Sequence, residues 1–283
     1  MNRIGIVGAN GRVGNLMVAK GCIPLDCDIR DTKSIEKAIA QEDLSVIASF
    51  AGKSSPEWCQ KKENLQEMLD VNARGVANLG DVTQKLNIPV VILSTDHVFS
   101  GRSYFDWTVK RWIKSGPYTE DYIRTVPVNR YGVSKLAGEH VATTPSISDH
   151  MKIVRTSYLF DTARLSDDIY RITANHQNTK SYPTFIHRSF MHTEHFVESF
   201  LYYLEHIEKM PKILHISGSQ TVSWATFMAS CIETRVSTGR LLTHRKDNEE
   251  LCPRPHKAGL VTALSAELGL PQFNYLDGLK LVD

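Results

Sequence analysis

The sequence predicts an α/β fold, a Rossmann-type doubly wound parallel sheet with a smaller C-terminal lobe. Short apolar runs alternate with helical patterns, which is typical of a parallel sheet covered by helices. A glycine-rich loop follows the first apolar run directly, and a Tyr and a Lys four residues apart fall in a later helical pattern. The alternation of apolar runs and helical patterns predicts the sheet. The glycine loop and the Tyr–Lys pair indicate which segments form a functional site.

The strands and helices follow from the spacing of apolar residues. Almost continuously apolar runs predict buried strands at residues 4–7, 46–50, 90–93 and 152–155. Helical patterns occupy residues 34–40 and 72–86. In residues 195–207, helical spacing predicts a stripe that faces the core, formed by Phe196, Phe200, Leu204 and Ile207.

The bulk properties are ordinary for a soluble protein of 283 residues, with 42% hydrophobic and 23% charged residues. A formal net charge of +2 gives no general case for nucleic-acid binding. No apolar run is long enough to cross a bilayer, and the N-terminal residues enter the first strand directly, which leaves no room for a signal peptide. Five cysteines without a Cys-x-x-Cys pair predict reduced thiols. We therefore expect a cytoplasmic protein with neither a nucleic-acid nor a membrane partner.

The glycine loop runs Gly8-Ala-Asn-Gly11-Arg-Val-Gly14, before a helix start at residues 15–20. Glycines at this place allow a tight turn and let backbone N–H groups approach a pyrophosphate at the helix N-terminus. An ordinary strand–helix turn is the alternative, and Arg12 would either contact phosphate or point into solvent. The loop predicts a dinucleotide site formed by Gly8, Asn10, Gly11, Arg12, Val13 and Gly14.

The adenosine end of such a site has more than one candidate residue. An acidic residue about 20 positions further on ordinarily binds the ribose hydroxyls. Asp26 and Asp28 are both candidates, although the span from Gly14 to Asp28 is short for a full helix and a second strand. Arg30 can instead meet the 2′-phosphate of NADP. These residues leave NAD and NADP both open.

The Tyr–Lys pair is Tyr131 and Lys135. Residues four apart lie one turn from each other on one face of a helix. A cation there favours the phenolate, which lowers the tyrosine pKa from about 10 and yields a usable acid near neutral pH. On its own such a pair is more often two surface residues of a helix. Because the chain also has the glycine loop, a catalytic Tyr–Lys pair is favoured here over a pair of surface residues.

Taken together, these residues resemble the extended short-chain dehydrogenase/reductases, and most closely the dTDP-4-dehydrorhamnose reductase-like group. The resemblance covers nearly the whole chain. It rests on Asp28-Ile-Arg-Asp31, Val71-Asn-Ala-Arg-Gly75, Ser94-Thr-Asp-His-Val-Phe-Ser-Gly101, Pro117-Tyr-Thr-Glu120, Pro127-Val-Asn-Arg-Tyr131, Arg155-Thr-Ser157, Arg188-Ser-Phe-Met-His192, Ser223-Trp224 and Arg254-Pro255.

The resemblance implies an NAD(P)H-dependent reductase of a 4-keto-6-deoxy nucleotide sugar, with NADPH favoured over NADH. Thr95 would hold the ketone oxygen, Tyr131 would supply the proton, and Lys135 would lower the tyrosine pKa and bind the nicotinamide ribose. Further cofactor contacts are implied for Asp28, Ile29, Arg30, Ala51, Gly52 and Asn72. The implied substrate contacts are Thr95, Asp96, His97, Tyr158, Arg188 and Arg254.

A guanidinium fork matches phosphate oxygens, so Arg188 or Arg254 would hold the substrate's pyrophosphate, with a surface ion pair as the alternative for each. A composition shift near residue 160 separates the expected NAD(P)-binding Rossmann domain, residues 1–160, from the substrate-binding lobe, residues 161–283, partly interleaved with it. A homodimer is left open.

Four departures from the family pattern bear on the substrate and the reaction. His97 replaces a tyrosine, and Tyr158 stands where tryptophan is frequent. Ser49-Phe-Ala-Gly52 replaces a segment of the Asn-Ala-Ala-Ala type, and the loop 101–117 is longer than usual. An epimerase or dehydratase on the same fold and a non-catalytic nucleotide-binding subunit therefore stay as alternatives.

Two further features, an aromatic and basic loop and a group of histidines, suggest binding sites that the rest of the sequence does not support. Trp107 and Trp112 lie among basic residues, a pattern that can bind single-stranded nucleic acid, but a surface excursion or subunit contact fits the near-neutral chain better. His187, His192 and His195 suggest metal ligands, but no carboxylate or cysteine completes the set, so no metal site is expected.

Overall fold

The computed structural model describes residues 3–163, 165, 181–233, 242–244 and 252–282. The chain forms two compact units, and each unit collects three segments of the sequence. Unit 1 consists of Met1–Val98, Pro127–Arg155 and Phe200–Leu214. Unit 2 consists of Phe99–Val126, Thr156–Ser199 and His215–Asp283. Neither unit is a continuous stretch of chain.

The sheet of unit 1 has six strands in the order β12-β7-β4-β3-β1-β2. β1 pairs in parallel with both β2 and β3, and β3 pairs in parallel with β4. The order reverses between β1 and β3, which makes the sheet doubly wound and confirms the predicted fold class. All four predicted strands are confirmed among its members, which are β1 (Ile4–Val7), β2 (Ile23–Leu25), β3 (Val46–Ser49), β4 (Val90–Thr95), β7 (Met151–Thr156) and β12 (Ile213–His215).

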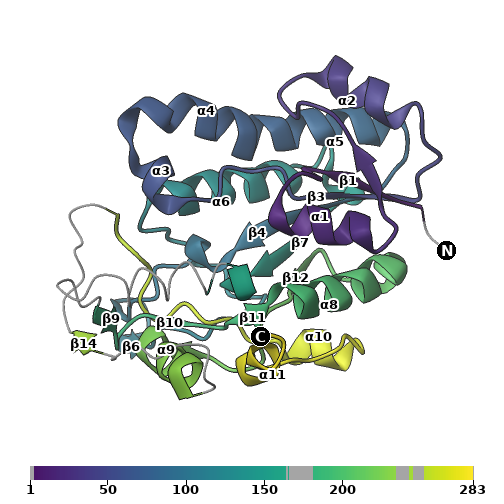
Figure 1. Cartoon of the computed structure of the whole chain (residues 1–283). Coiled ribbons are helices and arrows are strands. Elements are labelled where there is room, and N and C mark those ends of the chain that lie inside the picture. Colours follow the sequence, from purple (N-terminus) through teal and green to yellow (C-terminus); the bar gives the residue numbers. More distant parts are fainter. Residues whose placement is uncertain (1–2, 164, 166–180, 234–241, 245–251, 283) are drawn as a thin grey trace. The chain divides into compact units, whose positions relative to one another are not determined.

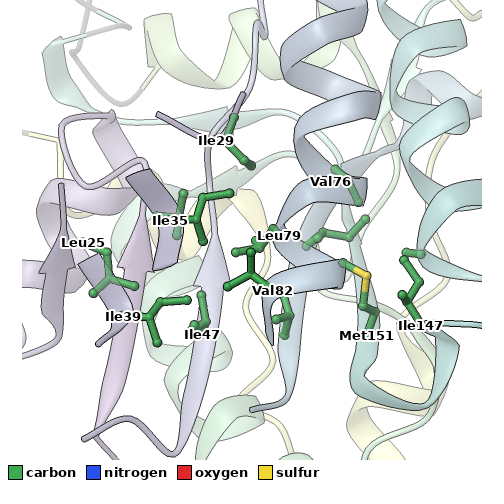
Figure 2. Close-up of a cluster of buried hydrophobic side chains, with 14 of the residues drawn as sticks. Leu25, Ile29, Ile35, Ile39, Ile47, Val76, Leu79, Val82, Ile147 and Met151 are labelled. Carbon is green, nitrogen blue, oxygen red and sulfur yellow. The ribbon is translucent and has the colours of Figure 1, made fainter. Parts of the chain in front are cut away.

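Helices α2 (Thr32–Ile39), α5 (Gly75–Lys85) and α6 (Arg130–Ala142) cover one face of this sheet (Figure 1). Apolar side chains of α2 and α5 pack against the strands in one buried cluster (Figure 2). Ile35, Leu79 and Ile47, from two helices and a strand, are each fully buried. Burying an aliphatic side chain of this size contributes roughly 1.5–3 kcal/mol. The cluster therefore fixes the helices on the sheet.

Several short helical turns connect these elements. α3 (Pro56–Gln60), η1 (Lys62–Asn64) and α4 (Leu65–Leu69) follow β3, and a π-helical turn, η2 (Asp70–Arg74), leads into α5. The 3-10 turn η3 (Asp96–Val98) continues β4, and η4 (Ser148–His150) precedes β7. The predicted helix over residues 72–86 is thus confirmed, with a π-helical start.

Helix α1 (Arg12–Ala19) lies on the other face of the sheet (Figure 1). Farther along the chain, α8 (Thr193–Glu205) carries the predicted apolar stripe. Its Phe196, Phe200 and Leu204 are fully buried, and Ile207, in the following turn η5 (Ile207–Lys209), is 5% exposed. The predicted core-facing stripe is therefore confirmed.

The short span before Asp28 accommodates both a helix and a strand because each is small. α1 has eight residues and β2 has three. Gly21, with φ +93°, makes the turn between them in a backbone conformation that favours glycine. Asp28 therefore follows the carboxyl end of β2 closely, on the side where doubly wound sheets bind ligands.

The centre of unit 2 is a cluster of aromatic side chains. Phe190 and Phe227 stack with ring centroids 4.1 Å apart, and Phe160 packs against Phe227 at 5.1 Å. Besides the hairpin described below, the described residues of this unit include β8 (Leu159–Phe160), β9 (Ser181–Pro183), β10 (His187–Arg188), β11 (Met191–His192), β13 (Val222–Ser223), β14 (Leu242–His244), α9 (Trp224–Glu233), α10 (Ala263–Glu267) and α11 (Tyr275–Leu279).

The long loop 101–117 forms a β-hairpin from β5 (Tyr104–Asp106) and β6 (Arg111–Ile113). Phe105 contacts Trp107 and Trp112 edge-on, with centroids 4.8 and 5.8 Å apart. The two tryptophans are 82% and 69% exposed. The predicted surface excursion is thus an aromatic hairpin, and a subunit contact there stays a prediction.

Candidate active site

The candidate site lies in unit 1, at the carboxyl ends of β1, β3 and β4. Doubly wound sheets bind ligands outside the carboxyl ends of their strands, where the strand order reverses, here between β1 and β3. Gly8 follows β1 with φ +81°, a conformation that favours glycine. A Cβ at Gly8 would meet the backbone nitrogen of Ala51 at 2.6 Å. The loops after β1 and β3 therefore lie against each other.

Gly11 and Gly14 differ in their surroundings. A Cβ at Gly14 would collide with the carbonyl oxygen of Gly8, so this position serves the close packing of α1. A Cβ at Gly11 would meet only that same oxygen, at 3.3 Å, which leaves open space beside it. Gly11 is also the N-cap of α1, so no cap side chain competes for the first N–H groups of the helix. Among the other predicted loop residues, Asn10 and Arg12 are exposed and Val13 is buried.

Asp28 and Arg30 form a bidentate ion pair beyond β2. Arg30 Nε lies 2.9 and 3.1 Å from the two carboxylate oxygens, and Nη2 lies 2.6 Å from Oδ2. Hydrogen bonds from Arg30 lower the pKa of Asp28 to about 2. The side chains are 46% and 50% exposed, so the pair adds little stability and can rearrange around a ligand.

Ile29 has a different environment from its neighbours. Its side chain is buried in the core cluster at 4% exposure, and its carbonyl oxygen accepts a hydrogen bond from Asn78. A Cβ at Gly75 would meet the Ile29 side chain at 2.7 Å, which shows how closely α5 packs there. The predicted cofactor contact of Ile29 stays a prediction, and its side chain belongs to the core.

Asn72 joins the loop after β3 to α6. Its Oδ1 accepts the N–H of Lys53 at 2.8 Å, and its Nδ2 donates to the Lys53 carbonyl at 3.0 Å. The same amide group donates to Ser134 Oγ at 2.8 Å. Asn72 is 1% exposed and lies in the π-helical turn. This amide therefore anchors the segment that follows Ala51 and Gly52, while its own cofactor contact stays a prediction.

Tyr131 and Lys135 lie one turn apart on α6, as predicted. Asn129 caps this helix, since its Oδ1 accepts the N–H of Gly132 at 2.8 Å. A Cβ at Gly52 would lie 3.9 Å from Lys135 Nζ, so the ammonium group reaches the loop after β3. Burial lowers the pKa of Lys135 from 10.5 to about 8, and the charges of Glu139 and Cys59 only partly oppose this shift.

Thr95 and Tyr131 both contact His97. Thr95 ends β4, and its Oγ1 accepts the backbone N–H of His97 at 3.2 Å. The imidazole packs edge-on against the Tyr131 ring, with centroids 5.3 Å apart. The Thr95 hydroxyl also donates to Asp96 at 3.2 Å. The three residues Thr95, Asp96 and His97 are buried, at 5%, 2% and 8% exposure. The structure thus groups the predicted catalytic residues within unit 1.

A buried polar cluster behind Lys135 was not predicted from the sequence. Glu139 binds the guanidinium of Arg155 at 2.9 and 2.7 Å and accepts a hydrogen bond from Ser94 Oγ at 2.5 Å. Because Ser94 directly precedes Thr95 and Arg155 lies on β7, Glu139 fastens α6 to two central strands. The only signal in the sequence is the spacing of four residues between Lys135 and Glu139, which puts both on one helix face.

The other three predicted substrate residues lie in unit 2. Tyr158 packs edge-on against Trp224, with centroids 4.7 Å apart. Arg254 is partly exposed. Arg188 is 4% exposed, and its guanidinium donates, at 2.8, 2.9 and 3.2 Å, to the carbonyl oxygens of His187, Pro255 and His256. Substrate contacts for all three residues stay predictions.

The clustered histidines occupy different environments. His187 Nδ1 lies 3.2 Å from the carbonyl oxygen of Phe185. The rings of His192 and His195 are 5.9 Å apart, and burial lowers the pKa of both. Over the parts of the chain that the structure describes, no group of three His, Cys, Asp or Glu side chains is arranged to hold a metal ion.

The site and both units fall within a single family model. The model of the RmlD substrate binding domain matches residues 2–282. The chain belongs to the RmlD substrate binding domain family. Membership in this family confirms the resemblance that the sequence motifs indicated, from the glycine loop to the C-terminal segments.

Curated relatives of this RmlD-family chain are named as reductases. The dTDP-4-dehydrorhamnose reductase of Sinorhizobium fredii is 27% identical over 166 residues, which cover 56% of this chain and 51% of that protein. The enzyme of the same name from Aggregatibacter actinomycetemcomitans is 32% identical over 171 residues, 56% of this chain and 52% of that protein. The dTDP-4-keto-6-deoxy-D-glucose reductase of Streptomyces niveus is 31% identical over 135 residues, 48% and 42% of the two chains. The chain spans about half the length of the curated relatives it matches.

Solved structures match over the whole length. The dTDP-4-dehydrorhamnose reductase of Bacillus anthracis, in complex with NADP, has a TM-score of 0.81 at 21% identity and covers 99% of this chain and 98% of its own. RMD from Pseudomonas aeruginosa, complexed with NADPH, has a TM-score of 0.72 at 15% identity. The match covers 100% of this chain and 96% of that protein. At these identities the likeness establishes the fold. Within the described ranges, no helix has the length and apolar character needed to span a membrane.

Proposed function

We propose that this protein is an NAD(P)H-dependent reductase of a 4-keto-6-deoxy nucleotide sugar, similar in its reaction to the dTDP-4-dehydrorhamnose reductases. The observation that carries the proposal is the contact of His97 with both Thr95 and Tyr131. Thr95 ends β4, and Tyr131 lies one turn before Lys135 on α6, so His97 contacts one residue from each of the two elements that would supply the hydroxyl and the phenol. Reduction of a ketone needs a donor that holds its oxygen and an acid that protonates it. The names of the relatives support the substrate class.

The residues of the chain hold the ketone oxygen and deliver the proton. The Thr95 hydroxyl, which donates to Asp96 in this structure, would turn to the ketone oxygen as negative charge grows there. Tyr131 would transfer its phenolic proton to the same oxygen. The ammonium group of Lys135 would stabilise the phenolate that remains. The bound nicotinamide cofactor supplies the hydride.

The residues around the reversal of strand order fit a dinucleotide. The open space at Gly11 and the helix N-terminus without a cap side chain suit a pyrophosphate, to which Arg12 can add a charged contact. Lys135 beside Gly52 suits the nicotinamide ribose. The exposed Arg30 suits a 2′-phosphate, so we favour NADPH, in agreement with the NADP and NADPH found in the similar solved structures.

We also propose that an arginine of unit 2 binds the pyrophosphate of the substrate. Arg254 is favoured over Arg188, because Arg254 is partly exposed whereas Arg188 is only 4% exposed. A cytoplasmic location agrees with the five cysteines, among which the structure contains no disulfide. A monomer and a homodimer are both compatible with the proposal, and sedimentation of the purified protein decides between them.

The deciding experiment measures NADPH and NADH oxidation with a panel of keto sugar nucleotides. Each cofactor incubated with the protein in the absence of a sugar nucleotide is the control. Stoichiometric oxidation with a 4-keto-6-deoxy sugar, and the reduced sugar as product, is the expected result. An isomerised or dehydrated sugar without net NADPH oxidation would identify an epimerase or dehydratase instead. Cofactor binding without turnover of any sugar would identify a binding subunit.

A further inference from the structure

The amide group of Asn129 makes two hydrogen bonds whose directions depend on each other. Its Oδ1 accepts the N–H of Gly132 at 2.8 Å, and only an oxygen can accept this capping bond. The amide NH₂ therefore points the other way, and Nδ2 lies 3.0 Å from Nδ1 of His97. Because an amide NH₂ can only donate, Nδ1 of His97 must accept.

A ring nitrogen that accepts a hydrogen bond carries no proton. His97 is therefore neutral, with its proton on Nε2. The opposite tautomer, or an imidazolium, would set two N–H groups against each other at 3.0 Å. Asn129 and His97 are 4% and 8% exposed, so water does not readily replace the lost bond. The cap of α6 thus selects one tautomer of His97.

His97 is in turn packed between the two groups of the proposed reaction. Its backbone N–H donates to Thr95 Oγ1 at 3.2 Å, and its ring meets the Tyr131 ring with centroids 5.3 Å apart. A Cβ at Gly132 would collide with the carbonyl oxygen of His97, so the first turn of α6 lies directly on this residue. A change in the His97 ring is therefore transmitted to Tyr131.

We propose that the hydrogen bond between Asn129 and His97 positions Tyr131 relative to Thr95, with His97 acting as a positioning residue in its Nε2–H form. The kinetic part of this inference rests on the proposed function, and the structural part does not.

The tautomer is measurable without turnover. Nitrogen-15 NMR of protein whose histidine rings are labelled with nitrogen-15 is expected to show His97 with an unprotonated Nδ1 and a protonated Nε2. The signals that disappear in the His97→Asn variant are assigned to the two ring nitrogens of His97. In Asn129→Asp, the carboxylate keeps the cap but accepts from His97, so the proton is expected to move to Nδ1. A wild-type His97 with its proton on Nδ1 overturns the proposal, whatever the enzyme does.

The kinetic test distinguishes an effect of the helix cap on the rate from an effect of the His97 tautomer on the rate. Asn129→Asp and Asn129→Ser both keep an oxygen at the N-cap, so α6 still begins at the same place. Each is expected to lower kcat by roughly tenfold to a hundredfold with little change in KM, since a displacement of about 1 Å near the reacting atoms costs up to about that factor. Both His97 variants lose the ring that contacts Tyr131, so both should be slower than the wild type. His97→Asn places an amide oxygen where Nδ1 was and is expected to lose less of the rate than His97→Gln, which places its amide at the Nε2 position.

Asn274 supplies the matched control, because its Oδ1 caps α11 in the same way. Asn274→Ser should leave kcat at the wild-type value. Wild-type kcat in both Asn129 variants, or equal rates in His97→Asn and His97→Gln, would overturn the proposal. If an Asn129 variant fails to fold, the comparison of the two His97 variants gives the same decision. A wild-type protein that reduces no keto sugar contradicts the proposed function, and the NMR result then still decides the structural part.

Discussion

Glu139 and Arg155 form an ion pair almost closed to water, with two contacts of 2.7 and 2.9 Å and side chains that are each 4% exposed. Glu139→Gln removes the charge and leaves the guanidinium buried opposite a neutral amide. We expect this to lower the free energy of unfolding by about 3–5 kcal/mol, measured by urea denaturation. The control is Glu42→Gln, since Glu42 and Arg3 form an exposed pair for which about 1 kcal/mol or less is expected. Equal losses from the two substitutions would show that burial does not matter here.

Tyr131→Phe tests the proposed acid. The ring and its contact with His97 remain, so folding and cofactor affinity should be preserved, while the transferable proton is lost. Turnover is expected to fall by roughly 10² to 10⁴, measured as NADPH oxidation with a keto sugar. Tyr122→Phe is the matched control, because it also removes a phenol from a tyrosine with an aromatic neighbour, Tyr118, and Tyr122 has no proposed role in the reaction. A wild-type rate in Tyr131→Phe would rule out the mechanism.

Gly11 and Gly14 should respond differently to substitution. A Cβ at Gly11 would meet only the carbonyl oxygen of Gly8, at 3.3 Å, so in Gly11→Val the fold is expected to survive with a small local shift while close approach of a pyrophosphate is blocked. Gly14→Val collides with the backbone of Gly8 and should lower stability as well. Cofactor titration combined with thermal melting separates the two effects. A Gly11→Val protein with normal melting and undiminished cofactor affinity would contradict the site.

Asp28 and Arg30 are expected to set the choice of cofactor. Arg30→Ala removes the cation that suits a 2′-phosphate, so affinity for NADPH should fall more than affinity for NADH. Asp28→Ala frees Arg30 from its bidentate partner and removes an acceptor for ribose hydroxyls, so it should shift preference toward NADPH. Titrating both cofactors with each variant measures the change in ratio. A ratio unaltered in both variants would place the 2′-phosphate elsewhere.

Lys135 gives a pH dependence whose sign follows from its lowered pKa. Below about pH 8, the lysine is charged in the folded and unfolded states alike, and the folded protein bears the full cost of burying the charge. Between about 8 and 10.5, the unfolded chain holds the proton that the folded protein has lost, so stability rises with pH. The free energy of unfolding of the wild type, minus that of Lys135→Met, should therefore rise across this window and stay flat below it. A difference that stays constant from pH 7 to 10.5 would mean that the lysine is not desolvated.

The sequence predicted those parts of the site that depend on local spacing. Tyr131 and Lys135 share a helix face because four residues make about one turn, and Gly8 to Gly14 connect a strand to a helix directly. The four strands were readable because parallel strands buried on both faces are almost continuously apolar. The span from Gly14 to Asp28 is short for a full helix and a second strand, and the small size of α1 and β2, which resolves this, leaves no mark in the apolar pattern.

Contacts between distant segments were not predictable in this way. Ser94 and Glu139 are 45 residues apart, and Asn72 and Ser134 are 62 residues apart. Their hydrogen bonds exist because α6 packs closely on its neighbours, which Gly138 allows by letting its backbone approach the carbonyl oxygen of Asn72. No periodicity encodes such an approach. The polar cluster behind Lys135 and the dual bonding of Asn129 therefore came only from the structure.

The segmented make-up of unit 1 has a consequence for its synthesis. Five strands of its sheet are complete by residue 156, but the edge strand β12, residues 213–215, is added much later. Until then, β7 presents an open edge of the kind that pairs with other chains. On the ribosome, the segment Thr156–Ser199, which belongs to unit 2, emerges before this edge can close. Pairing over such long separations slows folding, so the nascent chain should depend on chaperones until about residue 215 has left the exit tunnel.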